Sequence, residues 1–191
     1  MKYKKRTMNG LLILLTSIIL TALFSSGTVD TSIVFKTPTP TPAISSATSS
    51  ATVNVPVLYV VDGDTIAVSI DGKKENVRFI GIDTPETKDP RKLVQCFGRE
   101  AAEETKRMLT GQTVTLLSDP TQGDRDKYKR LLRYIILPDG TNVNAHLIAE
   151  GYAHEYTYGI PYLFQDDFKH AQRKAREEKK GLWNETVCPI N

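Results

Sequence analysis

The sequence contains few of the residues that bind soft metals or move protons at neutral pH. Among its 191 residues there are two cysteines, three histidines and one tryptophan. His146, His154 and His170 are each expected in a helix or at a strand end, so neither a zinc site nor a pair of catalytic histidines is predicted. The longest uncharged apolar run, Leu11–Phe24, has 14 residues, fewer than the ~20 that span a bilayer. With an ordinary 40% of hydrophobic residues, the chain is not a multi-span membrane protein, a collagen or a coiled coil.

The chain also lacks a strong excess of charge of one sign. It has 25 lysine and arginine residues against 22 aspartate and glutamate residues, which gives a net charge of +3. Four of these bases lie within the first six positions, so residues 28–191 carry 21 bases, 22 acids and a net charge of −1. Such a near-neutral chain does not bind a polyanion through bulk charge, and any affinity for one must come from a few well-placed cations.

Residues 1–27 follow the pattern of a secretory signal. A basic start precedes the apolar run, and the small residues Ser25, Ser26 and Gly27 follow it. This order is typical of a signal peptide. No Ala-x-Ala triplet marks a cleavage point, so an uncleaved signal anchor is the alternative, and only such an anchor would make the membrane a partner. In either case the rest of the chain is predicted to be extracellular, secreted or membrane-anchored.

Residues 28–52 are predicted to form a linker. Positions 37–52 hold five threonines, four serines and three prolines, and they carry no charge. Because such a segment buries almost nothing, it does not offset the entropy cost of ordering and is expected to be an extended spacer. A glycosylated or wall-spanning stalk is the functional alternative. The folded domain is then predicted over residues 53–191, close to the commonest domain size.

Strand and helix patterns alternate within this domain. Short β-branched runs bounded by turn residues predict strands, with Asp71-Gly72 as a hairpin turn. Apolar residues at helical spacing predict three helices, of which Gly111 ends the first and Gly151 the second. The predicted fold class is α+β, a small barrel such as the OB-fold. The expected strands cover residues 55–61, 65–70, 75–82, 112–117 and 131–137, and the expected helices residues 101–109, 143–150 and 164–175.

Two acidic segments accompany the first three strands. Asp62-Gly63-Asp64-Thr65 lies between two of them and by itself indicates a hairpin turn rather than a ligand site. Further on, Asp83 and Glu86 flank Thr84-Pro85, with Arg78 upstream. Two carboxylates this close are costly unless a cation neutralises them. An Arg78–Asp83 ion pair and a bound cation are the two interpretations, and residues 78–86 alone favour neither.

A charged segment, residues 124–130, precedes the last strand. A charge run in a loop is usually solvated surface. A tyrosine among lysines and arginines also supplies what a phosphate and a base require, a guanidinium for bidentate contacts and a ring for stacking. Both interpretations stay open on these residues alone.

Taken together, five motifs resemble those of the staphylococcal nuclease family. In chain order they are Asp62-Gly63-Asp64-Thr65, residues 78–86 (R-x-x-G-I-D-T-P-E), residues 126–130 (D-K-Y-x-R), Tyr156-x-Tyr158 and residues 179–183 (K-K-G-L-W). The resemblance implies a five-stranded OB-fold β-barrel with three α-helices. It also implies a Ca²⁺-dependent phosphodiesterase that takes DNA and RNA as substrates and leaves 3′-phosphate ends.

The resemblance implies a metal site and a general base. Asp64, Asp83 and the main-chain carbonyl of Thr84 match the family's Ca²⁺ ligands, and Asp62 matches a supporting acid beside them. Glu86 matches the general base. The chemistry agrees, because a hard cation held by oxygen ligands polarises a phosphoryl group, and a nearby carboxylate can accept the proton of the attacking water.

Further positions match residues that bind the substrate. Arg78 and Arg130 match the pair that grips the phosphate, where negative charge builds up during hydrolysis. The residues that match those around the terminal phosphate and base of a bound nucleotide are Lys127, Tyr128, Tyr156 and Tyr158, and Lys92 lies in the loop that matches another substrate-contacting lysine.

Three departures from the family pattern stand out. Lys129 replaces a glycine of the family motif. If the turn needs a positive φ, Lys129 would be strained there, and the direction of the Arg130 side chain would change. The Tyr156 and Tyr158 pair aligns only with a one-residue gap. Residues 96–97 (CF) replace a more polar pair.

Cys96 and Cys188 are the two cysteines of the chain. Because the count is even and the predicted compartment is oxidising, a disulfide between them is expected. No feature of the sequence demands an oligomer, so a monomer is expected.

A non-catalytic module of the same fold, binding nucleic acid or protein, is the alternative to a nuclease. Such a module is expected to lack one or more of the five catalytic and metal-binding positions. A secreted OB-fold binder of oligosaccharide or peptide would explain the barrel but not these residues. The chain retains all five: Asp64, Arg78, Asp83, Glu86 and Arg130.

Overall fold

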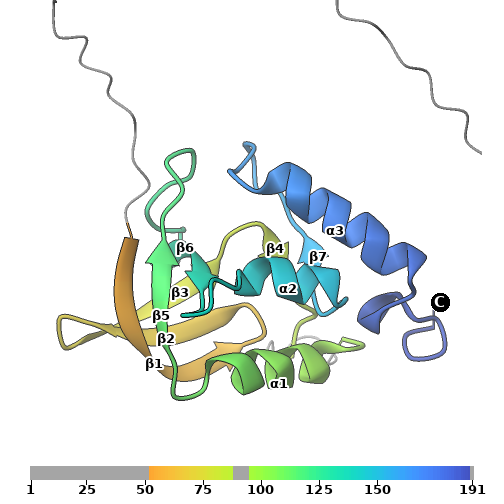
Figure 1. Ribbon diagram of the computed structural model, residues 1–191, viewed down its shortest axis with the longest axis horizontal. Helices are drawn as coiled ribbons and strands as arrows, with labels where there is room; N and C mark the ends of the chain where they lie inside the picture. The colour runs from red at the N-terminus through yellow and green to blue at the C-terminus, as the bar shows by residue number, and fades with distance from the viewer. Residues whose placement is uncertain (1–51, 88–94, 190–191) are drawn as a thin grey trace, which may run out of the picture. The chain divides into compact units, whose positions relative to one another are not determined.

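The protein is described by a computed structural model that covers residues 52–87 and 95–189. Five strands close into a barrel in the order β1–β2–β3–β6–β5, and two short strands, β4 and β7, pair beside it (Figure 1). With its three α-helices this is the predicted α+β barrel, so the fold class is confirmed. The signal segment, the linker up to residue 51 and Lys92 lie outside the described residues. The elements are β1 (Thr52–Asp62), β2 (Thr65–Ile70), β3 (Lys73–Phe79), β4 (Ile82–Asp83), α1 (Gly98–Leu109), β5 (Thr113–Leu117), β6 (Leu131–Ile136), α2 (Val143–Ala149), β7 (His154–Glu155), α3 (Gln165–Glu177) and the 3₁₀ helix η1 (Gly181–Trp183).

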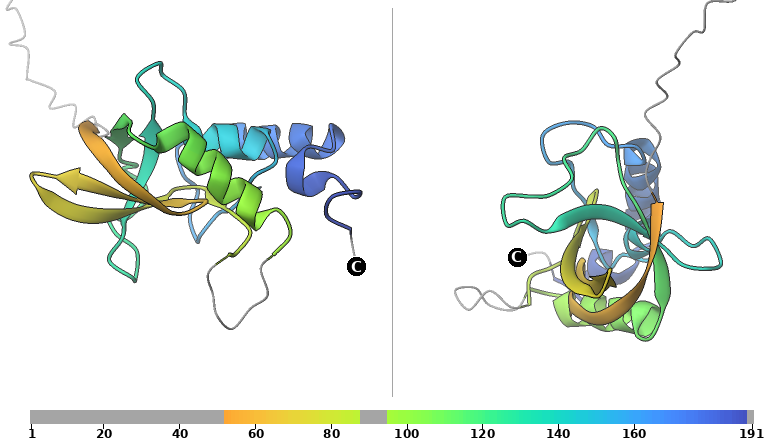
Figure 2. Two further views of the ribbon diagram at one scale, coloured as in Figure 1. Left: turned by 90° about the horizontal axis from the view of Figure 1, so that it is seen from below. Right: turned by 90° about the vertical axis from the view of Figure 1, so that its left-hand side faces the viewer.

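The barrel is filled by the apolar residues of its strands. The strands curl around a common interior (Figure 2), and side chains from β2, β3, β5 and β6 are buried there, as alternating strands predict. Each fully buried large apolar side chain contributes about 1.5–3 kcal/mol, so this interior is the main source of stability. The largest fully buried side chains of the strands are Tyr134, Phe79, Ile66, Ile82, Leu116, Ile135, Val68 and Val77.

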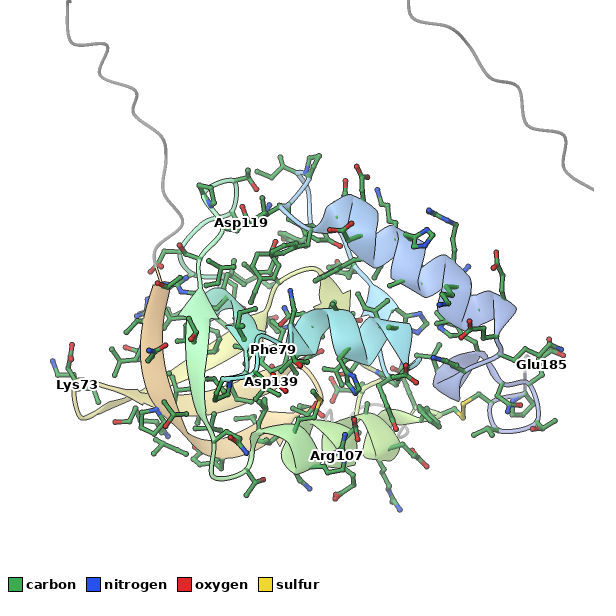
Figure 3. The ribbon with its side chains drawn as sticks, in the orientation of Figure 1. Lys73, Phe79, Arg107, Asp119, Asp139 and Glu185 are labelled. Carbon is green, nitrogen blue, oxygen red and sulfur yellow. A yellow bond between two sulfur atoms is a disulfide. The ribbon has the colours of Figure 1, made fainter. Side chains whose placement is uncertain are left out.

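Glycines with a positive φ lie in the turns that follow β2 and β3. The predicted hairpin at Asp71-Gly72 joins β2 to β3, with φ values of 50° and 73°, and Lys73 in Figure 3 lies beside this tip. The expected strand over residues 75–82 is wrong, because β3 ends at Phe79 and β4 starts at Ile82. Gly81 between them has a φ of 77°, and a side chain there would meet the ring of Tyr162 at 2.6 Å.

The helices cover the barrel and hold the β4–β7 pair. α1 packs along β1, whereas α2 contacts both β6 and α3. Asn144 of α2 is fully buried. Its side chain accepts from the Ile135 N–H at 3.0 Å and donates to the Ile80 carbonyl at 2.9 Å. This amide therefore joins α2 to β6 and to the turn that leads toward Asp83.

Candidate active site

Most of the predicted site residues gather around one pocket of about 500 Å³. Its walls come from the β1–β2 turn, β3, the segment after β4, and the loop before β6. Strand pairing explains this convergence, because Thr65 of β2 lies opposite Arg78 of β3, and Arg78 in turn lies opposite Leu132 of β6. The pocket is lined by Val61, Asp62, Asp64, Thr65, Asn76, Arg78, Asp83, Thr84, Glu86, Tyr128 and Arg130.

The Asp62-Gly63-Asp64 turn is both a hairpin turn and a wall of the pocket. Asp64 is 7% exposed, and its carboxylate accepts from the N–H of Thr84 at 3.0 Å, from the Thr84 hydroxyl at 2.9 Å and from the Thr65 hydroxyl at 3.0 Å. A Cβ on Gly63 would lie 2.8 Å from Thr84 Oγ1. The close approach of the two segments therefore requires glycine at this position.

Arg78 joins the two carboxylates that were predicted to bind metal. Its guanidinium forms an ion pair with Asp64 and donates to Asp83 Oδ1 at 2.7 Å. The Arg78–Asp83 ion pair, one of the two interpretations of this segment, is therefore present in the structure. The Arg78 side chain is only 14% exposed. Because both carboxylates meet one guanidinium, they face the same small volume. A cation there would sit beside a positive charge, which lowers its affinity unless a phosphate pairs with the arginine.

Two carboxyl groups of the pocket are shifted toward the protonated form. Burial raises the pKa of Asp62, although its Oδ1 accepts from the Gly63 N–H and the Thr87 hydroxyl, each at 2.9 Å. Partial burial also raises the pKa of Asp83, and the Arg78 guanidinium offsets only part of this effect. Negative charge in this pocket is therefore costly, and a positive partner is favoured there.

The loop before β6 aims Arg130 into the pocket. Asp126 organises it: its carboxylate accepts from the N–H groups of Tyr128 and Arg130, both at 2.9 Å, and from Arg130 Nε at 2.7 Å. Burial would raise the pKa of Asp126, but these hydrogen bonds outweigh it and lower the pKa. Lys129 has a φ of 66°, so the turn does take the left-handed conformation that suits glycine. Arg130 still reaches the pocket, because Asp126 holds both its backbone and its side chain.

Tyr128, with Arg130 and Lys127 near its ring, lines one side of the pocket. Tyr128 is 68% exposed, and its ring centroid lies 5.4 Å from the Arg130 guanidinium carbon and 5.1 Å from Lys127 Nζ. Tyr156 and Tyr158 do not line the pocket; their exposed rings lie 6.3 Å apart. The Tyr156 N–H donates to the Gly81 carbonyl at 3.0 Å, so this pair flanks the turn that leads to Asp83.

Two polar residues of the pocket wall were not predicted from the sequence. The Thr65 hydroxyl, which donates to Asp64, also lies 3.5 Å from Arg130 Nη1 and so links the acidic and basic sides. Its position directly after Asp62-Gly63-Asp64 is a signal that could have identified it. Asn76 of β3 lines the pocket as well, but nothing in its sequence context marks it.

The donor atoms of the pocket are of the type that a hard cation prefers. In the part of the chain that the structure describes, no three His, Cys, Asp or Glu side chains converge in an arrangement that could hold a metal ion by themselves. Asp64, Asp83 and Thr84, the three residues predicted to hold the metal, all line the pocket and offer only oxygen donors. Oxygen ligands of this kind, completed by water, fit Ca²⁺ rather than zinc or copper.

Comparison with known proteins places this geometry in a family. The family described as "Staphylococcal nuclease homologue" matches residues 76–185. A thermonuclease of Staphylococcus hyicus is 43% identical over 129 residues, which is 67% of this chain and 74% of the relative. Endonuclease YncB of Bacillus subtilis is 38% identical over 141 residues, 73% of this chain and 65% of the relative. A thermonuclease of Staphylococcus intermedius is 39% identical over 127 residues, 66% of this chain and 74% of the relative. The chain belongs to the staphylococcal nuclease family.

Proposed function

We propose that the chain is a Ca²⁺-dependent nuclease that hydrolyses phosphodiester bonds of DNA and RNA and leaves 3′-phosphate ends. The observation that carries this proposal is that four carboxylates and two guanidiniums line one pocket. The names of its relatives, two thermonucleases and an endonuclease, support the same activity. The residues that would act are Asp64, Asp83, Glu86, Arg78 and Arg130.

The two arginines would bind the scissile phosphate. Arg78 enters the pocket from β3 and Arg130 from the loop before β6, and each can donate two hydrogen bonds to non-bridging oxygens. Since Arg78 is mostly buried, its charge acts in a medium of low dielectric constant, where it is worth more than at the surface. Tyr128 at the rim would stack on the sugar or base and hold the strand in place.

Glu86 would act as the general base. Its carboxylate accepts a proton as the water oxygen bonds to phosphorus. The bond from phosphorus to the 5′ oxygen breaks and that oxygen takes a proton from solvent, which leaves a 3′-phosphate and a 5′-hydroxyl, and Glu86 then returns its proton to solvent. Asp64, Asp83 and the Thr84 carbonyl would hold Ca²⁺, with Asp62 in support. When bound, Ca²⁺ supplies positive charge that polarises the phosphoryl group.

We further propose that the nuclease is secreted or anchored by residues 1–27, that residues 28–52 are its linker, and that it acts as a monomer. The Cys96–Cys188 disulfide supports an oxidising compartment. Within residues 52–87 and 95–189, no helix has the length and apolar character to cross a bilayer. Extracellular DNA and RNA would then be the substrates.

The test is cleavage of single-stranded DNA and of RNA by the full chain, with Ca²⁺ and with EGTA. Glu86→Gln and Arg130→Ala should each lower kcat by at least ~100-fold, because each removes a transition-state contact. Glu103→Gln and Arg173→Ala change exposed residues of α1 and α3 and should leave kcat unchanged. Binding without cleavage would instead identify a non-catalytic module, and cleavage that survives EGTA and both active-site variants would refute the mechanism.

A further inference from the structure

One residue binds both backbone polar groups of the proposed general base. The Glu86 N–H donates to Oε1 of Gln95 at 2.7 Å, and the Gln95 N–H donates to the Glu86 carbonyl at 3.0 Å. These two hydrogen bonds fix the peptide groups on either side of the Glu86 Cα. Because the backbone sets the direction of the Cα–Cβ bond, Gln95 sets how the Glu86 carboxylate enters the pocket.

The start of α1 packs directly against the segment that carries Glu86. The Gly98 N–H donates to the Gln95 carbonyl at 3.1 Å. A Cβ on Gly98 would lie 2.8 Å from the carbonyl oxygen of Pro85, so the helix start leaves no room for a side chain. Phe97 has a φ of 65°, and its ring stacks on Tyr152 with centroids 5.4 Å apart. Residues 95–98 therefore pack closely against Pro85 and Glu86 and are called the support below.

The disulfide fixes this support to the C-terminal tail. Cys96, adjacent to Gln95, is bonded to Cys188, and Figure 3 shows this bond between the segment before α1 and the tail. Within the tail the Cys188 N–H donates to the Asn184 carbonyl at 2.8 Å, and the tail is anchored to the domain where the Leu182 N–H donates to the Gly151 carbonyl at 2.9 Å. Movement of Gln95 away from Glu86 is thus opposed by a covalent link.

We propose that Gln95 is a positioning residue for the Glu86 carboxylate and that the Cys96–Cys188 disulfide holds Gln95 in place. This inference rests on the proposed nuclease function and deepens it. The phosphate-binding residues Arg78 and Arg130 are held by the carboxylates of Asp64, Asp83 and Asp126 rather than by Gln95. Loss of the support therefore lowers the rate of the chemical step and leaves substrate affinity unchanged.

The decisive variants are Gln95→Ala, which removes the acceptor for the Glu86 N–H, and Gln95→Glu, which keeps it. Gln95→Ala should lower kcat by at least ~10-fold with KM within about twofold, because a displaced catalytic group costs rate rather than binding. Gln95→Glu should restore kcat to within about threefold of wild type, since a carboxylate oxygen accepts the same hydrogen bond. Gln112→Ala, at an exposed position after α1, is the matched control and should change neither constant. The double variant Cys96→Ser/Cys188→Ser should lower kcat with unchanged KM at a temperature where circular dichroism shows it folded.

Amide hydrogen exchange at Glu86 supplies a readout that needs no catalysis. Exchange should be faster in Gln95→Ala than in wild type, Gln95→Glu or Gln112→Ala. Unchanged exchange and unchanged kcat in Gln95→Ala, or equal losses of kcat in Gln95→Ala and Gln95→Glu, would overturn the positioning role. Absence of cleavage by wild type, with exchange still accelerated in Gln95→Ala, would instead refute the proposed function and keep the structural support.

Discussion

Removal of the disulfide should cost a large part of the stability of the domain. The perturbation is Cys96→Ser/Cys188→Ser, which replaces sulfur by oxygen at an exposed and a half-buried position and so removes little packing. The two cysteines are 92 residues apart in the sequence. For a closed loop of this length, the chain-entropy relation gives about 4.6 kcal/mol at 25 °C. Measured values usually fall below this relation, so we expect a loss of about 3–4 kcal/mol.

Equilibrium unfolding in urea, followed by circular dichroism, measures this loss. The midpoint should fall, and the slope m should rise, because an unfolded chain without the cross-link is more expanded and exposes more surface. In a thermal scan the same loss corresponds to about 10–15 °C for a domain of this size. Wild type treated with reductant is the control and should match the double variant. A loss below ~1 kcal/mol with unchanged m would refute the loop-closure reasoning.

Three further predictions follow from groups outside the pocket. Hydrogen bonds from Arg107 hold the pKa of Glu104 at about 2, below its ordinary 4.5. This stabilisation is present above pH 4.5 and is lost as the pH falls toward 2. Because the partner arginine is exposed, it amounts to about 1–2 kcal/mol. Glu104→Gln should therefore flatten the pH dependence of the free energy of unfolding over this range. Lys129→Gly should stabilise the domain by about 0.5–1 kcal/mol in urea unfolding, because its φ of 66° strains a side chain; a destabilisation would contradict this. Tyr134→Phe removes a buried hydroxyl that donates to Asp119 at 2.6 Å and should cost about 1.5–3 kcal/mol in the same assay, whereas the exposed Tyr59→Phe should cost much less.

Local patterns predicted most of the elements and missed those that depend on distant contacts. The Asp71-Gly72 hairpin and the α2 helix were predicted because short-range sequence patterns determine them. The break at Gly81 was missed: this residue has a φ of 77° and lies so close to the ring of Tyr162, 81 residues further along the chain, that a side chain would not fit, and no local pattern reports such a contact. For the same reason nothing in the sequence marked Asn144, whose amide reaches the carbonyl of Ile80 across 64 residues.

The strained turn at Lys129 shows how sequence and structure complement one another. The family motif has glycine there, which raised the question of whether the turn needs a positive φ and where Arg130 would then point. Only the structure answers it: Asp126 holds Arg130 through its N–H and Nε, at 2.9 and 2.7 Å, and so keeps it in the pocket despite the strain. A side chain four residues upstream compensates for the missing glycine.

By itself, the sequence determined which chemical groups are present: the acids at the strand ends, the arginines near them, a pair of cysteines and an apolar pattern that folds as a barrel. It also assigned the net positive charge to the first six residues, so that recognition of a polyanion depends on a few cations. The tertiary structure decided that Arg78 bridges Asp64 and Asp83, that Arg130 faces the same pocket, and that Gln95 supports Glu86. The physical reason is that composition and periodicity report local preferences, whereas distances between charged groups are set by barrel closure, which pairs strands that are far apart in the chain.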